Sequence, residues 1–73
     1  MSQQSTGLSD QERGRLLPTK RAVAAHLGKG IETIYRYEKA GILTFIPTGM
    51  RTFGQYEGII DQQMRAAFSG TAA

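Results

Sequence analysis

The chain has 73 residues, no cysteine and a net charge of +3 at pH 7. A chain of this length forms one small domain and has no room for a second hydrophobic core. The absence of cysteine excludes a disulfide framework and a thiolate metal site, and His26 has no cluster of ligand residues around it, so we expect neither a metal nor a cofactor. No apolar run approaches the ~20 residues that a membrane span needs, so we expect no membrane partner.

The charges are segregated along the chain. Between Arg13 and Arg51 there are eight basic and two acidic residues, a net charge of +6, whereas the rest of the chain has one basic and four acidic residues. This segregation favours a polyanion as the partner of the middle of the chain. Basic segments are often merely solvated, so the charge pattern alone leaves that alternative open.

The N-terminal part predicts a leader and a short helix. Residues 1–8 are mostly Ser, Gln, Thr and Gly, a composition typical of disorder. Ser9 and Glu12 have the spacing of a capping box, which predicts a helix over about Asp10–Leu16 that Gly14 weakens.

Two helices joined by a glycine turn are predicted next. Thr19 is a suitable N-cap for a helix over Lys20–Leu27, and Gly28–Gly30 forms a turn. The stretch Gly30–Gly41 predicts a second helix, in which Gly41 adopts the left-handed conformation. Two faces follow from helical spacing, with Ile31, Ile34 and Tyr37 on one and Glu32, Tyr35, Arg36 and Lys39 on the other. This pattern is typical of a helix-turn-helix, although generic helical hairpins share it.

The period changes after Gly41. Residues Thr44–Pro47 read as a strand, Thr48–Arg51 as a turn in which Gly49 supplies a positive φ, and the chain then returns through Phe53. An isolated hairpin is unstable in water, so we expect Phe53 and Phe45 to pack in the core. The turn carries Thr48, Met50 and Arg51 at its tip.

A last helix is predicted over Gly54–Phe68. Its apolar residues at helical spacing are Tyr56, Ile59, Ile60, Met64 and Phe68. Gly58 inside it marks either close packing or a weak point. Residues 69–73 read as a flexible tail, so one domain spans residues 9–68.

The segment Thr33–Leu43 resembles the signature that follows the turn in MerR-type winged helices: a threonine and an aliphatic residue, an arginine-aromatic pair, an acidic residue, and a Gly-aliphatic-Leu exit. The flanking Val23–Gly28 and Gly49–Phe53 are similar to the MerR-like subset that contains phage excisionases, or recombination directionality factors. The match covers about Leu17–Asp61. It implies a mainly α fold with a small β-hairpin, the winged helix-turn-helix.

Two features depart from that family. MerR regulators continue into a long dimerising coiled coil and an effector domain, for which this chain has no counterpart, and this favours the short excisionase-like proteins. The turn position that is usually aliphatic is Lys29, and the helix cap that is usually serine is Gly30. We expect Lys29 to be exposed and available to phosphate.

The resemblance implies a sequence-specific, architectural DNA-binding factor without catalysis. Such proteins place the recognition helix, here residues 30–40, in the major groove and the wing, here residues 44–53, in the adjacent minor groove. Several copies bind side by side, bend the attachment site and direct integrase towards excision. Double-stranded DNA, integrase and neighbouring copies are the implied partners, in the cytoplasm of a bacterial host. A separate hypothesis, a protein-interaction module that uses the last helix, has Glu57 and Asp61 meet a basic patch on a neighbouring copy or on integrase.

The DNA-binding residues that the resemblance implies are Thr19, Lys20, Arg21, Lys29, Glu32, Thr33, Tyr35, Arg36, Lys39, Thr48, Met50 and Arg51. Glu32 would accept from a cytosine amino group, and Arg36 would donate to guanine or to phosphate. Three cations, Lys20, Arg21 and Lys39, would hold phosphates, and Arg51 suits a narrow minor groove.

The remaining positions have other expected roles. Thr33 suits packing or a backbone phosphate, and Tyr35 is left undecided between the DNA surface and the protein. Tyr37 is expected in the core, and Glu38 is expected to pair with a basic residue of the chain itself.

Other functions stay open. A small phage or plasmid transcriptional regulator and the DNA-recognition domain of a terminase small subunit share the winged helix. A protein-interaction module using the last helix is a third alternative. An enzyme is disfavoured, because the chain has one histidine, no cysteine, no glycine-rich phosphate loop and no carboxylate pair with a basic partner.

Overall fold

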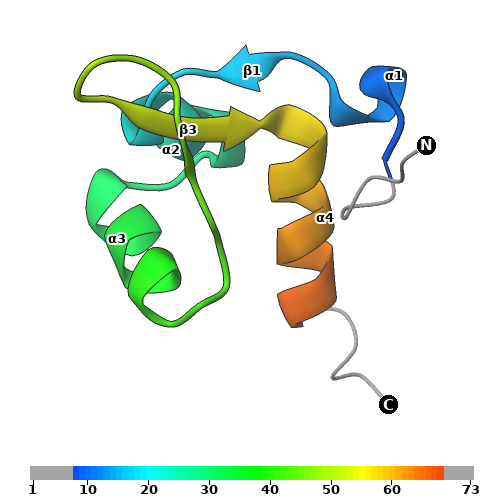
Figure 1. Cartoon of the computed structure of the whole chain (residues 1–73). Coiled ribbons are helices and arrows are strands. Elements are labelled where there is room, and N and C mark those ends of the chain that lie inside the picture. The colour runs from blue at the N-terminus through cyan, green and yellow to red at the C-terminus, as the bar shows by residue number, and fades with distance from the viewer. Residues whose placement is uncertain (1–7, 69–73) are drawn as a thin grey trace.

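The computed structural model describes residues 8–68, which form four helices and three short strands (Figure 1). In chain order these are α1 (Asp10–Arg13), β1 (Leu16–Leu17), α2 (Lys20–Leu27), α3 (Ile31–Lys39), β2 (Ile46–Pro47), β3 (Phe53–Tyr56) and α4 (Glu57–Phe68). The strands pair antiparallel in the order β1-β3-β2. The fold is mainly α with a small β-hairpin, as the sequence predicts. Of the predicted leader only Leu8 is described, and the predicted tail 69–73 lies outside the described residues.

Helices α2 and α3 form where they are predicted, because local caps define their ends. The Thr19 hydroxyl accepts a hydrogen bond from the Ala22 backbone N–H at 3.0 Å, and Gly28 ends α2 with φ 69°. The backbone N–H groups of Gly28 and Lys29 donate to carbonyls of the last turn at 3.2 and 2.9 Å. Gly41 ends α3 in the predicted left-handed conformation, with φ 81°.

The core is formed by side chains from the sheet, the three longer helices and the loop after α3. Its buried members are Leu17, Val23, Ala24, Ile34, Leu43 and Ile60. Full burial of one aliphatic side chain contributes about 1.5–3 kcal/mol relative to exposure. Ile34, which is 0% exposed, therefore fixes the rotation of α3 about its axis. Ile31 and Tyr37 pack beside the core, as predicted. None of the described helices is long and apolar enough to cross a membrane.

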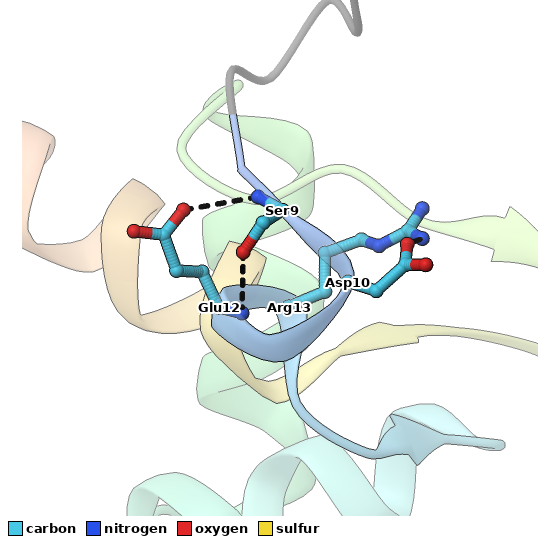
Figure 2. A network of polar contacts seen from close by, with 4 residues as sticks. All are labelled: Ser9, Asp10, Glu12 and Arg13. Carbon is cyan, nitrogen blue, oxygen red and sulfur yellow. Dashed lines mark hydrogen bonds and ion pairs between the residues drawn. The ribbon is translucent and has the colours of Figure 1, made fainter.

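Helix α1 is held by the predicted capping box (Figure 2). The Glu12 carboxylate accepts from the Ser9 backbone N–H at 2.9 Å, and the Ser9 hydroxyl accepts from the Glu12 N–H at 3.2 Å. Figure 2 also shows the ion pair between Arg13 and Asp10 within the same turn. The two capping-box bonds satisfy the backbone N–H groups of Ser9 and Glu12 at the start of a helix that has only four residues.

Two predicted helix boundaries are wrong. The first helix ends at Arg13 instead of Leu16, because Gly14 takes φ 72° and Leu16–Leu17 pairs with the edge of β3. The last helix begins at Glu57 instead of Gly54, because residues 53–56 form the central strand of the sheet. Both errors have the same cause. Strand β1 pairs with β3, which is about 40 residues away in the sequence, and no local sequence pattern predicts that pairing.

The hairpin also differs from expectation in two places. Among the described glycines, positive φ occurs at Gly14, Gly28 and Gly41, so Gly49 does not have the predicted conformation. Phe45 packs against the core as predicted, but Phe53 is 46% exposed. Phe53 is the first residue of β3, next to the turn, where the core no longer covers both of its sides.

Two glycines are required by close backbone approaches. A Cβ at Gly54 would lie 1.9 Å from the Leu17 carbonyl oxygen, and one at Gly58 would lie 1.9 Å from the Glu12 carbonyl oxygen. Gly54 lets β1 lie against β3, and Gly58 lets α1 dock on α4. Of the two readings of Gly58, close packing is correct.

Gly54→Ala should lower the free energy of unfolding by about 2–3 kcal/mol, because the added methyl group meets backbone atoms that cannot rotate away. Denaturant unfolding followed by circular dichroism measures this. Gly30→Ala is the control, since its Cβ would have no neighbour within 4 Å and its φ is −75°, and it should cost less than about 1 kcal/mol. Equal stability of the two variants would contradict the close contact at Gly54.

Candidate nucleic-acid interface

An open groove of about 300 Å³ lies between the start of α2, helix α3 and the turn of the β2–β3 hairpin. Its lining residues are Thr19, Lys20, Arg21, Ile31, Tyr35, Arg51, Thr52 and Phe53. In Figure 1, α3 and the hairpin turn lie on one side of the molecule, and α1 and α4 lie on the other. The groove therefore lies between α3 and the hairpin turn, which are on the same side of the molecule.

The groove brings together five of the twelve predicted site residues, namely Thr19, Lys20, Arg21, Tyr35 and Arg51. Ile31, Thr52 and Phe53 also line it, although the sequence did not mark them as site residues. Thr52 and Phe53 directly follow Arg51 in the sequence, so their position next to a predicted site residue could have identified them. The expectation that Phe53 is a core residue concealed it.

The exposed face of α3 is the predicted one. Glu32, Tyr35, Arg36 and Lys39 are all exposed, opposite the buried Ile34. Thr33 is partly buried at the border of this face. The predicted division of α3 into an inward and an outward side is confirmed, because the burial of one isoleucine determines where its neighbours point.

Five predicted cations keep their full hydrogen-bonding capacity. Among residues 8–68, the exposed side chains of Arg21, Lys29, Arg36, Lys39 and Arg51 make no hydrogen bond or ion pair within the chain. Each can offer all its donors to a ligand. Lys29 is exposed in the turn before α3, as predicted.

Lys20 differs from these five. Its Nζ lies 2.7 Å from Glu38 Oε1, and its side chain is 24% exposed. The predicted pairing of Glu38 with a basic residue of the chain is confirmed. The same nitrogen lies 5.2–5.8 Å from the ring centroids of Tyr35, Phe45 and Phe53. This ammonium group already has partners, so we do not assign it the phosphate contact that the resemblance implies.

The hairpin tip combines an anchored residue with two exposed ones. The Thr48 hydroxyl donates to the Pro18 carbonyl and lies 3.0 Å from the Thr52 hydroxyl, so Thr48 ties the turn to the segment before α2. Met50 is 96% exposed, and Arg51 beside it is exposed too. The tip therefore presents an apolar and a cationic side chain together.

The acidic residues of α4 have partners within the chain. Glu57 Oε2 accepts from Arg15 Nε at 3.0 Å, and Asp61 Oδ1 lies 2.8 Å from His26 Nε2. Both carboxylates therefore already have a partner within the chain, and their contact with a basic patch on another protein stays a prediction. Within residues 8–68, no group of three or more His, Cys, Asp or Glu side chains is placed to hold a metal ion.

No family model matches the chain, and neither the curated proteins nor the solved structures contain a match. The groove, the exposed face of α3 and the hairpin tip are therefore the features from which function is inferred.

Thr48→Val should loosen the hairpin and lower the free energy of unfolding by about 1 kcal/mol, because the Pro18 carbonyl loses its donor. Hydrogen exchange at the Thr48 amide, which donates to the Thr52 carbonyl at 3.0 Å, should become faster. Thr33→Val is the matched control, since its partly buried hydroxyl has no partner among the described residues. Unchanged exchange in the Thr48 variant would contradict the anchoring role.

Proposed function

We propose that this chain is a non-catalytic, sequence-specific DNA-binding factor of the excisionase type, a winged helix-turn-helix in which α3 is the recognition helix and the β2–β3 hairpin is the wing. The observation that carries the proposal is the set of five unpaired cations around α3 and the hairpin tip. Three other basic side chains are already paired with acidic residues: Arg13 with Asp10, Arg15 with Glu57 and Lys20 with Glu38. A polyanion is the kind of partner that can pair with all five of these cations.

The outward face of α3 is suited to the major groove. An α-helix fits that groove, and its exposed side chains can reach base edges and phosphates. Glu32 can accept from a cytosine amino group, and Arg36 can donate to guanine acceptors or to a phosphate. Lys39, one turn after Tyr35, is placed to hold a phosphate. Unpaired Glu32 would be repelled by phosphates, so its presence among cations favours contact with a base over contact with the backbone.

The groove supplies the second part of the interface. Arg21 lines it from the start of α2, and Arg51 lines it from the hairpin. The two arginines come from different elements that line one concave surface, an arrangement that suits a phosphate backbone passing between α3 and the wing. Arg51 at the tip would then lie in the adjacent minor groove.

The role in recombination is the part of the proposal that comes from the family resemblance. Excisionase-type proteins bind side by side, bend attachment-site DNA and direct integrase towards excision. A small transcriptional regulator or a terminase DNA-recognition domain would use the same interface. An excision assay with the cognate integrase, run beside a reporter-repression assay and a packaging assay, separates the three roles.

Binding to a duplex should weaken steeply with salt. If all five unpaired cations neutralise phosphates, log Kobs should fall against log[salt] with a slope of about −4.5, and fewer contacts give a shallower slope. Fluorescence anisotropy with labelled attachment-region duplexes measures this. Lys39→Gln should reduce the slope by about one.

Arg15→Gln is the control for that measurement. It removes the same charge from an 85%-exposed arginine that is paired with α4, away from α3, and it should leave the slope unchanged. Salt-independent binding, or no binding to any duplex from the region, would contradict the proposed function.

Met50 gives the proposal a specific bending element. Apolar side chains that enter the minor groove separate base steps and kink DNA by about 20–90°. Met50→Gln should therefore reduce the bend, measured as energy transfer between dyes at the ends of a duplex, while Met50→Leu keeps it. A Gln variant that bends DNA as the parent does would remove Met50 from the mechanism.

A further inference from the structure

The Lys20 ammonium group, whose side chain is 24% exposed, lies close to three aromatic rings and a carboxylate, which we call the Lys20 cage. Its Nζ lies 5.5 Å from the Tyr35 ring centroid, 5.2 Å from that of Phe45 and 5.8 Å from that of Phe53. The fourth side is Glu38 Oε1 at 2.7 Å. Ring faces carry a partial negative charge, so all four neighbours attract the same cation.

These neighbours come from separate parts of the chain. Lys20 is the first residue of α2, whereas Tyr35 and Glu38 lie on α3. Phe45 lies in the loop before β2, and Phe53 begins β3 beside the hairpin turn. One charge therefore joins the proposed recognition helix to the proposed wing, across the start of α2.

Phe45 packs against the core, whereas the other two rings are largely exposed. Tyr35 is 53% exposed and Phe53 is 46% exposed, and both line the open groove with Lys20. An exposed ion pair alone contributes little, but a cation held against several ring faces has partners that water does not replace equally well. Tyr35 of α3 and Phe53 of the hairpin both contact the Lys20 ammonium group. Without it, no charge would hold these two rings together across the groove.

We propose that Lys20 is a positioning residue that sets the spacing between α3 and the hairpin, and that it does not contact phosphate. The effect of this spacing on DNA binding rests on the proposed function, because a helix in one groove and a wing in the next must be correctly spaced to bind one DNA site. The cage itself is a property of the free protein.

The first test uses the free protein. Protons above aromatic rings resonate upfield, so the ε-methylene protons of Lys20 should lie upfield of those of Lys29 and Lys39, which are exposed and have no ring contact among the described residues. Glu38→Gln should move the Lys20 signal towards theirs. Coincident lysine signals in the parent protein would overturn the cage.

The second test compares adjacent charge removals, also without DNA. Lys20→Gln should accelerate hydrogen exchange at the Thr48 amide of the hairpin, whereas Arg21→Gln, at an exposed residue without a partner, should not. Lys20→Arg, which keeps a cation, should restore slow exchange. Equal exchange in the two Gln variants would overturn the positioning role.

The third test uses DNA. Lys20→Gln should weaken binding to the preferred duplex about tenfold, with little effect on an unrelated duplex and an unchanged salt slope. Arg21→Gln should weaken both and reduce the slope by about one. A slope reduced by one in the Lys20 variant would make Lys20 a phosphate contact and overturn the proposal. If the parent protein binds no duplex, the proposed function fails, and the two DNA-free tests still decide whether Lys20 positions the hairpin.

Discussion

The packing of α3 on α2 is the constraint on which the rest of the molecule depends. Ile34 is fully buried in the same cluster as Val23 and Ala24, and the small side chain of Ala24 leaves space for the close approach of the two helices. Once Ile34 points inward, Glu32 and Arg36 must point outward, because helical geometry relates the two directions. The candidate interface is thus a consequence of core packing and needs no separate device to orient it.

The central strand β3 provides the second constraint. Its Gly54 lies against the Leu17 carbonyl, and its ends connect the hairpin turn to α4. The strand therefore relates the N-terminal segment, the hairpin and the last helix to one another. The hairpin turn is further tied to the segment before α2 through Thr48, and to α3 through the contacts of Lys20. These polar and cation–π contacts add to the pairing of β2 with β3 and to the packing of Phe45 against the core.

Ion pairing divides the described surface into two kinds. Near α1 and α4, charges are matched within the chain, as in Arg13 with Asp10 and Arg15 with Glu57. Around α3 and the hairpin tip, cations are exposed without partners. Pairing lowers the attraction of a surface for an external charge, so a polyanion would be drawn to the α3 side. This division supports the proposed DNA-binding face more strongly than the net charge of +3 does.

Local signals in the sequence determined the helices of the candidate site. Thr19, Gly28 and Gly41 act through bonds to residues within a few positions, so their capping roles were predictable. The capping box of α1 was predictable for the same reason. The burial of Ile34 and the packing of Tyr37 beside the core were predictable from helical spacing. The exposure of Lys29 was predicted from the family resemblance, because a lysine at a turn position that is usually aliphatic cannot fill the gap between the two helices.

Tertiary structure alone decided what depends on contacts between distant segments. The pairing of Leu16–Leu17 with β3 shortened one predicted helix, and the strand role of residues 53–56 shortened another, since strand pairing has no local signature in segments this short. Phe53 became a groove residue instead of a core residue. Lys20 became a caged ammonium instead of a free cation, because Glu38 and three rings converge on it only when the chain is folded. Helical periodicity thus shows which way a side chain points, and the packing of distant segments determines what it meets there.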